Sequence, residues 1–517
     1  MNPRPEIMRA LGTRDDSVNA MLPDCTLPDP LPSNVQDLPS QILSADEIAI
    51  TECDPVVLVG ELQSKKWSCE KVVRAFLKRA ALAQKTTNCI TELLWKEAIA
   101  RAQHLDSLPQ PAAPLHGLPI SIKEQFGVPG KINNNGFVAC CDRIQGPPCS
   151  LYGVVEGCGA VIFARTTQPQ SNRNLSAGGS SGGEGALVGF RGSPLGLGGD
   201  IGGSIRSPAA NNGVYGFKPT PFRVGNTGGM GLIVGQEGII GCIGPLSPTL
   251  SGIELFMKAY LDTMPWVKEN YLVPIPWRDI QLSKRLKIGI MWSDGMVKPH
   301  PPILRALSEV ANALKSADFE VVDWQPKEHD ECWKLTSALY YEDGGHRLRQ
   351  MLKAGNEQLL PLTEWLLCQD EVKSRTVEEV WDLKAKRNAY RSMYNQHWLD
   401  TGRDDGRPVD AILCPVGPGC APPHDQTRYW NYTSQWNLLE YPAISFPVTQ
   451  VDTRLDVPED GYVPLNELDR FNHGLYTTPE RYVDAPVSLQ LVTRRYEDEK
   501  CIAILRNIEG ALKRELR

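Results

Sequence analysis

The 517-residue sequence lacks long apolar runs. No stretch of about eighteen apolar residues occurs that could span a membrane, and the first forty residues hold no apolar segment typical of a secretory signal. The chain also lacks any block of five or more consecutive basic residues, and its formal net charge is −7. We therefore expect no nucleic-acid partner, no membrane association and a cytoplasmic location.

The fourteen cysteines lack the spacing of a zinc site or of a disulfide framework. The densest group is Cys140, Cys141, Cys149 and Cys158, which has neither paired C-x-x-C spacing nor a nearby histidine. Scattered cysteines without a secretory signal are typical of reduced thiols. We expect buried free thiols here, rather than a metal site.

Composition and periodicity divide the chain into an arm and one large domain. Residues 1–40 are rich in Pro and Asp and show little periodicity, which predicts a flexible or loosely docked N-terminal arm. Residues 41–517 are predicted to form a single domain. It begins with a helical layer over 41–110, where Ser44 and Glu47 form a candidate capping box.

Short apolar segments alternate with amphipathic ones in the rest of the chain. Residues 117–122 and 159–165 are predicted strands, and the first delivers Lys123 to its end. Further strands are expected at 286–291, 319–322, 411–415 and 443–448, and helices at 302–317, over most of 330–400 and at 497–512. The pattern predicts an α/β fold with a central mixed β-sheet covered by helices on both faces.

Two serines lie in glycine-rich segments 24 residues apart. Ser180 lies in GGSSGGE (178–184), and Ser204 lies in DIGGSIR (200–206). Consecutive small residues let successive backbone N–H groups converge on one point, as an oxyanion requires. The candidate donors are the amides of Ile201, Gly202, Gly203 and Ser204.

A serine nucleophile needs a base, and neither segment contains a histidine. The other available base is a neutral lysine, whose pKa must be lowered by burial or by nearby positive charge. Lys123 follows the apolar run 118–122 and is placed for this role, although a lone lysine is more often solvated at the surface. Turns and phosphate sites also use glycine-rich loops, but 196–203 lacks G-x-G-x-x-G spacing. The two serine segments together with Lys123 favour a hydrolase.

Residues 178–208 resemble the amidase signature, GGSSGGE through DIGGSIRxP, almost position for position. The similarity extends to 117–124, 215–219, 244–247 and 485–490, and the core of the signature occupies 117–250. In detail, the chain is most similar to the fungal acetamidase-like branch, including Trp436, Asn437 and Pro415. The resemblance implies the amidase signature fold and hydrolysis of a small carboxamide, acetamide-like or aryl or alkyl, without metal or cofactor.

The resemblance also implies a Ser-Ser-Lys triad. Ser204 would attack the carbonyl and form an acyl-enzyme, Ser180 would relay its proton, and Lys123 would be the base. A cis peptide bond would precede Ser180. The supporting residues would be Ser181, Asp200 and Arg206, with a surface ion pair as the alternative for the last two.

The chain departs from the family pattern at two places. Between Gln170 and Ser171 it lacks a stretch that contributes to the wall of the acyl pocket in the family, through a true deletion or an error in the gene model. A true deletion would open the pocket, expose Lys123 to water and raise its pKa. In the loop 131–136, asparagines replace small hydroxyl residues, either as substitute hydrogen-bonding groups or as solvated turn residues.

Two other function classes stay open. The gap after Gln170 raises the hypothesis of a catalytically impaired, amidase-like binding protein. The shared signature raises that of a transamidase subunit, which the lack of a basic patch disfavours. The oligomeric state is also open, with a homodimer as one option.

Overall fold

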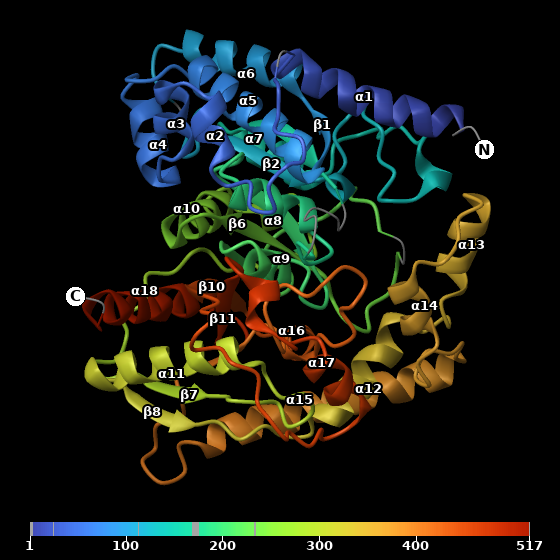
Figure 1. Cartoon of the computed structure of the whole chain (residues 1–517), viewed down its shortest axis with the longest axis vertical. Coiled ribbons are helices and arrows are strands. Elements are labelled where there is room, and N and C mark those ends of the chain that lie inside the picture. The colour runs from blue at the N-terminus through green and yellow to red at the C-terminus, as the bar shows by residue number, and fades with distance from the viewer. Residues whose placement is uncertain (1–3, 24, 112, 168–174, 232–233, 516–517) are drawn as a thin grey trace.

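The computed structural model describes residues 4–23, 25–111, 113–167, 175–231 and 234–515. Within them, eleven strands form one mixed sheet that runs from the N-terminal end of the molecule to its C-terminal half (Figure 1). In spatial order the strands are β1 (Ile90–Leu93), β3 (Val161–Thr166), β2 (Pro119–Lys123), β4 (Gly196–Asp200), β6 (Cys242–Ser247), β5 (Tyr215–Lys218), β10 (Ala443–Gln450), β11 (Pro486–Val492), β9 (Ala411–Pro415), β7 (Lys287–Ile290) and β8 (Glu320–Asp323). Strand β2 is parallel to β3 and β4, and β7 is parallel to β8 and β9.

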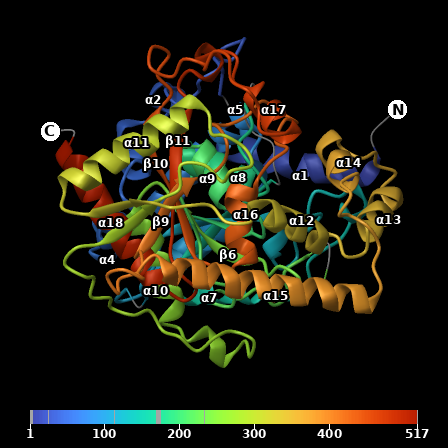
Figure 2. The same cartoon turned by 90° about the horizontal axis from the view of Figure 1, so that it is seen from below.

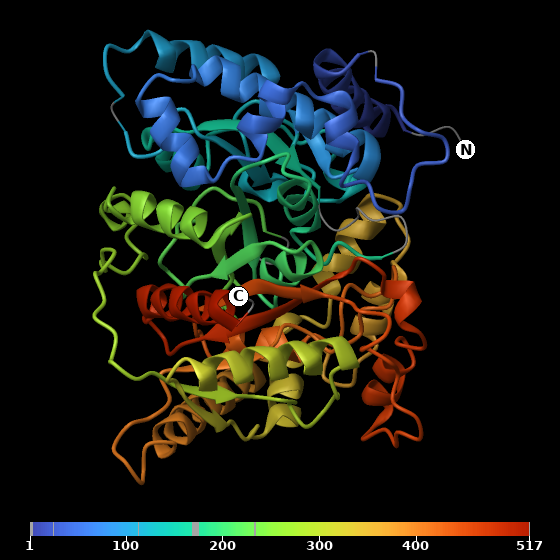
Figure 3. The same ribbon diagram turned by 60° about the vertical axis from the view of Figure 1, so that its left-hand side comes forward.

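Helices cover both faces of this sheet, as the sequence predicts. Helices α10, α11 and α18 pack on one face, and α8, α9 and α16 lie on the other (Figure 2). The helices are α1 (Pro5–Met21), α2 (Leu38–Ile42), α3 (Ala45–Thr51), α4 (Pro55–Gln63), α5 (Cys69–Thr87), α6 (Trp95–Ser107), α7 (Ser150–Gly157), α8 (Gly182–Gly189), α9 (Arg206–Asn211), α10 (Leu250–Leu261), α11 (Pro301–Ser316), α12 (His329–Tyr340), α13 (His346–Ala354), α14 (Pro361–Leu367), α15 (Val377–Asp400), α16 (Asn431–Leu438), α17 (Glu467–His473) and α18 (Asp498–Glu515). The early helices form a layer at the N-terminal end of the sheet, beside β1 and β3 (Figure 3).

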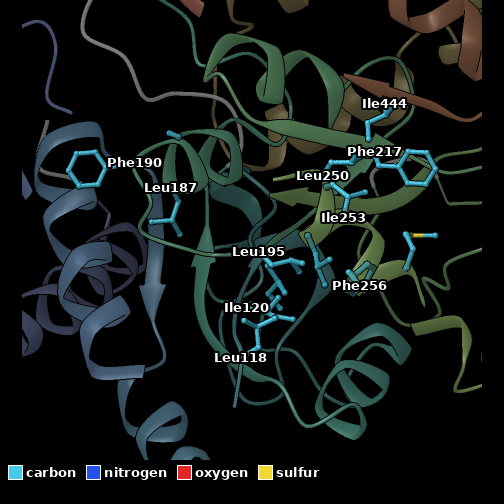
Figure 4. Close-up of a cluster of buried hydrophobic side chains, with 14 of the residues drawn as sticks. Leu118, Ile120, Leu187, Phe190, Leu195, Phe217, Leu250, Ile253, Phe256 and Ile444 are labelled. Carbon is cyan, nitrogen blue, oxygen red and sulfur yellow. The ribbon is translucent and has the colours of Figure 1, made fainter. Parts of the chain in front are cut away.

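The core around β2 is aliphatic and aromatic. Leu118 and Ile120 from the β2 region lie near Leu195, with Ile253 and Phe256 of α10 close by (Figure 4). All five side chains are fully buried. Burial of each such side chain contributes about 1.5–3 kcal/mol, so this core fixes the strand that ends at Lys123.

The predicted flexible arm over residues 1–40 contains a helix instead. Helix α1 begins at Pro5, a residue suited to the first turn, and packs against β1 and α5. The hydroxyl of Ser17 accepts a 3.0 Å hydrogen bond from the Leu93 amide, and Val18 is buried beside it. The sequence does not reveal this helix because its contact with the body rests on few buried positions and no apolar stripe.

Two local predictions are confirmed, and one strand was not predicted. The capping box at α3 is confirmed, with the Glu47 amide donating to Ser44 Oγ and the Ser44 amide donating to Glu47 Oε2. Strand β2 ends at Lys123, as predicted. Strand β4, however, is not predicted, because its sequence GLGGD contains almost no residues that favour strands.

The described residues also bear on membranes and metals. No helix among them is both long and apolar enough to cross a membrane. They contain no group of three or more His, Cys, Asp or Glu side chains arranged to share a metal ion. The four clustered cysteines, Cys140, Cys141, Cys149 and Cys158, are buried free thiols.

Candidate active site

Three chain segments bring the predicted triad residues into one region. Lys123 lies at the end of β2, Ser180 lies just before α8, and Ser204 lies between β4 and α9. The Nζ atom of Lys123 donates a 2.6 Å hydrogen bond to Ser180 Oγ. The Ser181 amide donates to the Ser204 carbonyl oxygen over 3.0 Å, which ties the two serine loops together. The peptide bond between Gly179 and Ser180 is cis, so that prediction is confirmed.

The contact between the two serine hydroxyls is not formed. Among the described residues, no hydrogen bond joins Ser180 Oγ to Ser204 Oγ, whereas a proton relay requires one. Both serines are partly exposed, so a substrate can reach them. Catalytic hydrogen bonds of this kind often close only when substrate binds.

Lys123 is buried, with 1% of its surface exposed. Burial lowers the pKa of its amine to about 7, against the opposing attraction of Asp200 and Glu184. The expectation that the gap after Gln170 exposes this lysine to water is therefore wrong. Strand β2 lies between β3 and β4 and contacts α8, and these elements keep Lys123 buried. The junction Gln170–Ser171 itself lies outside the described residues.

Asp200 organises the loop that carries Ser204. Its carboxylate accepts hydrogen bonds from the amides of Gly203 (2.8 Å) and Ile205 (3.1 Å). Arg206 adds two bonds, from Nε at 3.1 Å and from Nη2 at 3.0 Å. Asn437 donates a further bond of 2.9 Å. Burial raises the pKa of Asp200, but the Arg206 guanidinium and these donors outweigh it and hold the pKa well below its usual range.

The surface ion pair considered for Asp200 and Arg206 is wrong, because both side chains are fully buried. Arg206 also donates to Gln490 Oε1 at 3.1 Å and to Asn437 Oδ1 at 2.6 Å. Gln490 in turn donates to two backbone carbonyls. The loop that carries Ser204 is thus anchored to β11 and α16, which lie more than 200 residues further along the chain.

The predicted oxyanion donors divide into two groups. The Gly203 amide donates to Asp200, so its hydrogen stabilises the loop and is not free for a ligand oxygen. The amides of Ile201, Gly202 and Ser204 donate to no other described residue. These three amides are therefore the ones that can bind a ligand oxygen.

Two residues that sequence reasoning missed hold carbonyl groups of this loop. The Tyr340 hydroxyl donates to the Ile201 carbonyl over 3.0 Å, and Thr433 Oγ1 donates to the Gly202 carbonyl over 2.7 Å. Fixing a carbonyl also fixes the N–H of the following residue, since the peptide unit is planar. The Tyr340 bond therefore orients the Gly202 amide, one of the three that can bind a ligand oxygen. The Thr433 bond orients the Gly203 amide, which donates to Asp200. Tyr340 and Thr433 lie 139 and 231 residues from the carbonyls that they bind. No local sequence pattern could therefore identify them.

Ser181 and the asparagines of the loop 131–136 also form hydrogen bonds in the structure. Ser181 Oγ donates to the Gly199 carbonyl and accepts from its amide, at 3.2 and 3.3 Å. In the loop 131–136, Asn133 is buried and donates to Gln145, and Asn134 accepts from the Gly136 amide. For Asn133 the hydrogen-bonding alternative is the correct one, whereas the Asn134 bond, to the amide two residues further on, is that of a turn residue.

Comparisons with known proteins show the family of this chain. The family model described as Amidase matches residues 71–173 and 170–502. The chain belongs to the amidase family. This amidase is 36% identical to an acetamidase of Emericella nidulans, with 93% of each chain covered, and 33% identical to an acetamidase of Aspergillus oryzae, with 92% and 93% covered. A solved fatty acid amide hydrolase matches it with a TM-score of 0.92 and 32% identity, over 98% of this chain and 95% of that one.

The same comparisons bear on the stretch expected to be missing after Gln170. The two matched stretches of the family model overlap at residues 170–173, so the match to the model is interrupted at this junction. The alignment with the Emericella acetamidase has 511 positions, whereas 93% of 517 residues is about 481, so about 30 positions have no residue of this amidase. These positions are gaps in this amidase within the aligned region.

Proposed function

We propose that this amidase hydrolyses a small carboxamide to an acid plus ammonia or an amine through an acyl-Ser204 intermediate. The observation that carries the proposal is the buried Lys123, whose amine lies 2.6 Å from Ser180 Oγ. Because burial lowers its pKa to about 7, the lysine amine is partly neutral at pH 7 and can accept a proton. Ser204 lies on the neighbouring loop, beside amides that can bind an oxyanion.

In this mechanism Ser204 Oγ attacks the amide carbon while its proton passes to Ser180 and the Ser180 proton passes to Lys123. The negative charge on the carbonyl oxygen is stabilised by the amides of Ile201, Gly202 and Ser204. Lys123 returns the proton through Ser180 to the leaving nitrogen, and the carbon–nitrogen bond breaks. Water then attacks the acyl-Ser204 ester with the same base, releasing the acid and restoring the serine.

The proposed substrate class rests on the two relatives named acetamidase. Their name indicates an amide with a short acyl group. The test measures ammonia release from acetamide, propionamide and benzamide, and amine release from an anilide. We expect turnover of at least one of them, and its loss in Ser204→Ala. Equal rates in wild type and in a folded Ser204→Ala variant would overturn the proposal.

A second candidate function is an amidase-like binding protein without effective catalysis. The interrupted match to the family model at residues 170–173 favours it, because a stretch of the acyl pocket wall is expected at this junction. The buried Lys123 counts against it. Any amide turnover above the Ser204→Ala background excludes this candidate. A transamidase role, a cytoplasmic location, the absence of a nucleic-acid partner and a homodimer remain predictions.

A further inference from the structure

A second carboxyl group lies beneath the triad and has no role in the mechanism above. Glu184, in the first turn of α8, is fully buried. Its Oε2 atom lies 2.6 Å from Ser121 Oγ on β2, and its Oε1 atom lies 2.7 Å from Thr166 Oγ1 on β3. Ser121 is two residues before Lys123, so both side chains lie on the same face of β2. Thr166 is the register partner of Lys123.

The hydrogen bonds around Ser121 determine where its proton points. Ser193 Oγ lies 2.8 Å from the Leu195 carbonyl, which can only accept, so the Ser193 hydrogen is used there. Ser121 Oγ lies 3.0 Å from Ser193 Oγ, and in this arrangement Ser121 donates the hydrogen of that contact. Each hydroxyl carries one hydrogen, so Ser121 has none left for Glu184. The 2.6 Å contact between Ser121 and Glu184 needs a hydrogen on Glu184 Oε2.

An ionised Glu184 would change this chain. Ser121 would then donate to the carboxylate, and Ser193 would either leave the Leu195 carbonyl, which also accepts from the Ser121 amide, or face the Ser121 oxygen at 3.0 Å with no hydrogen between them. Either change removes one hydrogen bond among buried groups. A protonated Glu184 satisfies every contact, since Thr166 donates to Oε1 while Oε2 donates to Ser121.

We propose that Glu184 is a neutral carboxylic acid in the folded enzyme at neutral pH, and that it is a positioning residue which holds the end of β2 without presenting a negative charge to Lys123. The inference rests on the proposed function, in which Lys123 is the base. An anion at this position would favour the ammonium form of Lys123 and raise its pKa. The neutral acid leaves more of the amine free to accept a proton at pH 7.

The surroundings of Glu184 fit a neutral group. Burial raises its pKa to about 8, although the hydroxyls of Ser121 and Thr166 and the charge of Lys123 lower it. The buried Cys89 thiol also interacts with it and has a pKa raised by burial to about 12. Other charged groups on the elements packed against α8 have their own partners: Arg165 on β3 with Glu92 and Glu124, Asp200 on β4 with Arg206, and Arg79 on α5 with Glu52.

Strand β4 has a glycine, Gly196, where it passes the Glu184 carboxyl group. A Cβ atom on Gly196 would lie 2.1 Å from Glu184 Oε2 and 3.1 Å from Ser121 Oγ. Only glycine leaves room at this point for both groups. The glycine-rich sequence of β4 therefore serves the packing of Glu184 as well as the loop of Ser204.

The variant Glu184→Gln tests the proposal through a pH profile. Its amide nitrogen donates to Ser121 and its oxygen accepts from Thr166, which reproduces the pattern of the protonated acid. We expect kcat/KM within about threefold of wild type and an acid limb within about 0.3 pH units of the wild-type midpoint. If Glu184 is instead ionised in the wild type, removing its charge moves that limb to lower pH by about one unit or more, which overturns the proposal.

A second measurement does not depend on activity. The infrared difference spectrum between wild type and Glu184→Gln at pH 7 should show the loss of a protonated-carboxyl C=O band. Glu499→Gln is the matched control, since Glu499 is buried between Arg223 and Arg278 and should lose a carboxylate band instead. Loss of a carboxylate band in Glu184→Gln would overturn the proposal even if no amide is hydrolysed. If Glu184→Gln fails to fold, Ser121→Ala should shift the same acid band, and an unshifted spectrum contradicts the proposal.

Discussion

Lys123 Nζ and Ser180 Oγ, 57 residues apart in the sequence, are joined by a 2.6 Å hydrogen bond inside the protein. The lysine is buried and the serine is partly exposed, so the contact connects the interior of the sheet with the surface where substrate arrives. Because burial lowers the pKa of the lysine to about 7, the same contact can carry a proton from the hydroxyl to the amine.

The pH dependence of catalysis should report Lys123. Below its pKa of about 7 the amine is protonated and has no lone pair, so it cannot act as a base. We expect kcat/KM to rise with pH through about 7 and then to level off. Initial rates over a range of buffers at constant ionic strength measure this limb, and a rate that is flat across neutral pH contradicts the assignment.

Replacement of Lys123 by methionine should remove the base and keep most of the buried volume. General-base catalysis contributes on the order of 10²–10⁴-fold, so we expect a loss of kcat/KM in that range. Lys218→Met is the matched control, because Lys218 is also fully buried but donates to the Pro219 carbonyl. Its loss should stay below about tenfold. Equal losses of kcat/KM in the two variants would mean that the loss comes from removing a buried lysine in general, and not from removing the base.

Asp200→Asn should destabilise the whole fold. The change leaves the Arg206 guanidinium buried without its counter-charge, which costs about 3–5 kcal/mol. Urea unfolding monitored by tryptophan fluorescence gives the free energy of unfolding. Asp330→Asn removes an exposed pair with Lys334 and should cost less than about 1 kcal/mol. Similar values for both would show that the buried pair does not anchor the nucleophile loop.

Gly203→Ala should damage the nucleophile loop by direct collision. The added Cβ would lie 2.3 Å from Thr433 Oγ1, and Gly203 has φ of +129°, a conformation that alanine rarely adopts. We expect amide hydrolysis to fall at least about a hundredfold, since the donors that face the oxyanion move with the loop. Gly60→Ala in α4 meets nothing within 4 Å and should leave the rate unchanged. An active Gly203→Ala enzyme would argue against this oxyanion site.

Sequence reasoning located the groups that a short motif carries and missed those that only folding brings together. The glycine-rich segments and the apolar run before Lys123 are local patterns, so Ser180, Ser204 and the end of β2 could be predicted. Tyr340 and Thr433 lie on α12 and α16, and their approach to the loop depends on packing across the sheet.

The fold shows the same division between local and non-local information. The capping box of α3 is encoded by two residues and was predictable. Three of the five residues of β4 are glycine, and its strand conformation comes from pairing with β2 and β6 rather than from its own residues. Helix α1 also depends on distant contacts, with β1 and α5. Neither could be inferred from periodicity.

Covalent labelling of Ser204 tests the central claim most directly. Incubation of the folded protein with a fluorophosphonate, followed by peptide mass spectrometry, identifies the residue that acts as nucleophile. We predict a single adduct on Ser204, absent from Ser204→Ala and formed much more slowly in Lys123→Met. Absence of any adduct on the folded wild-type protein, or an adduct on another residue with Ser204 unmodified, would contradict the proposed mechanism.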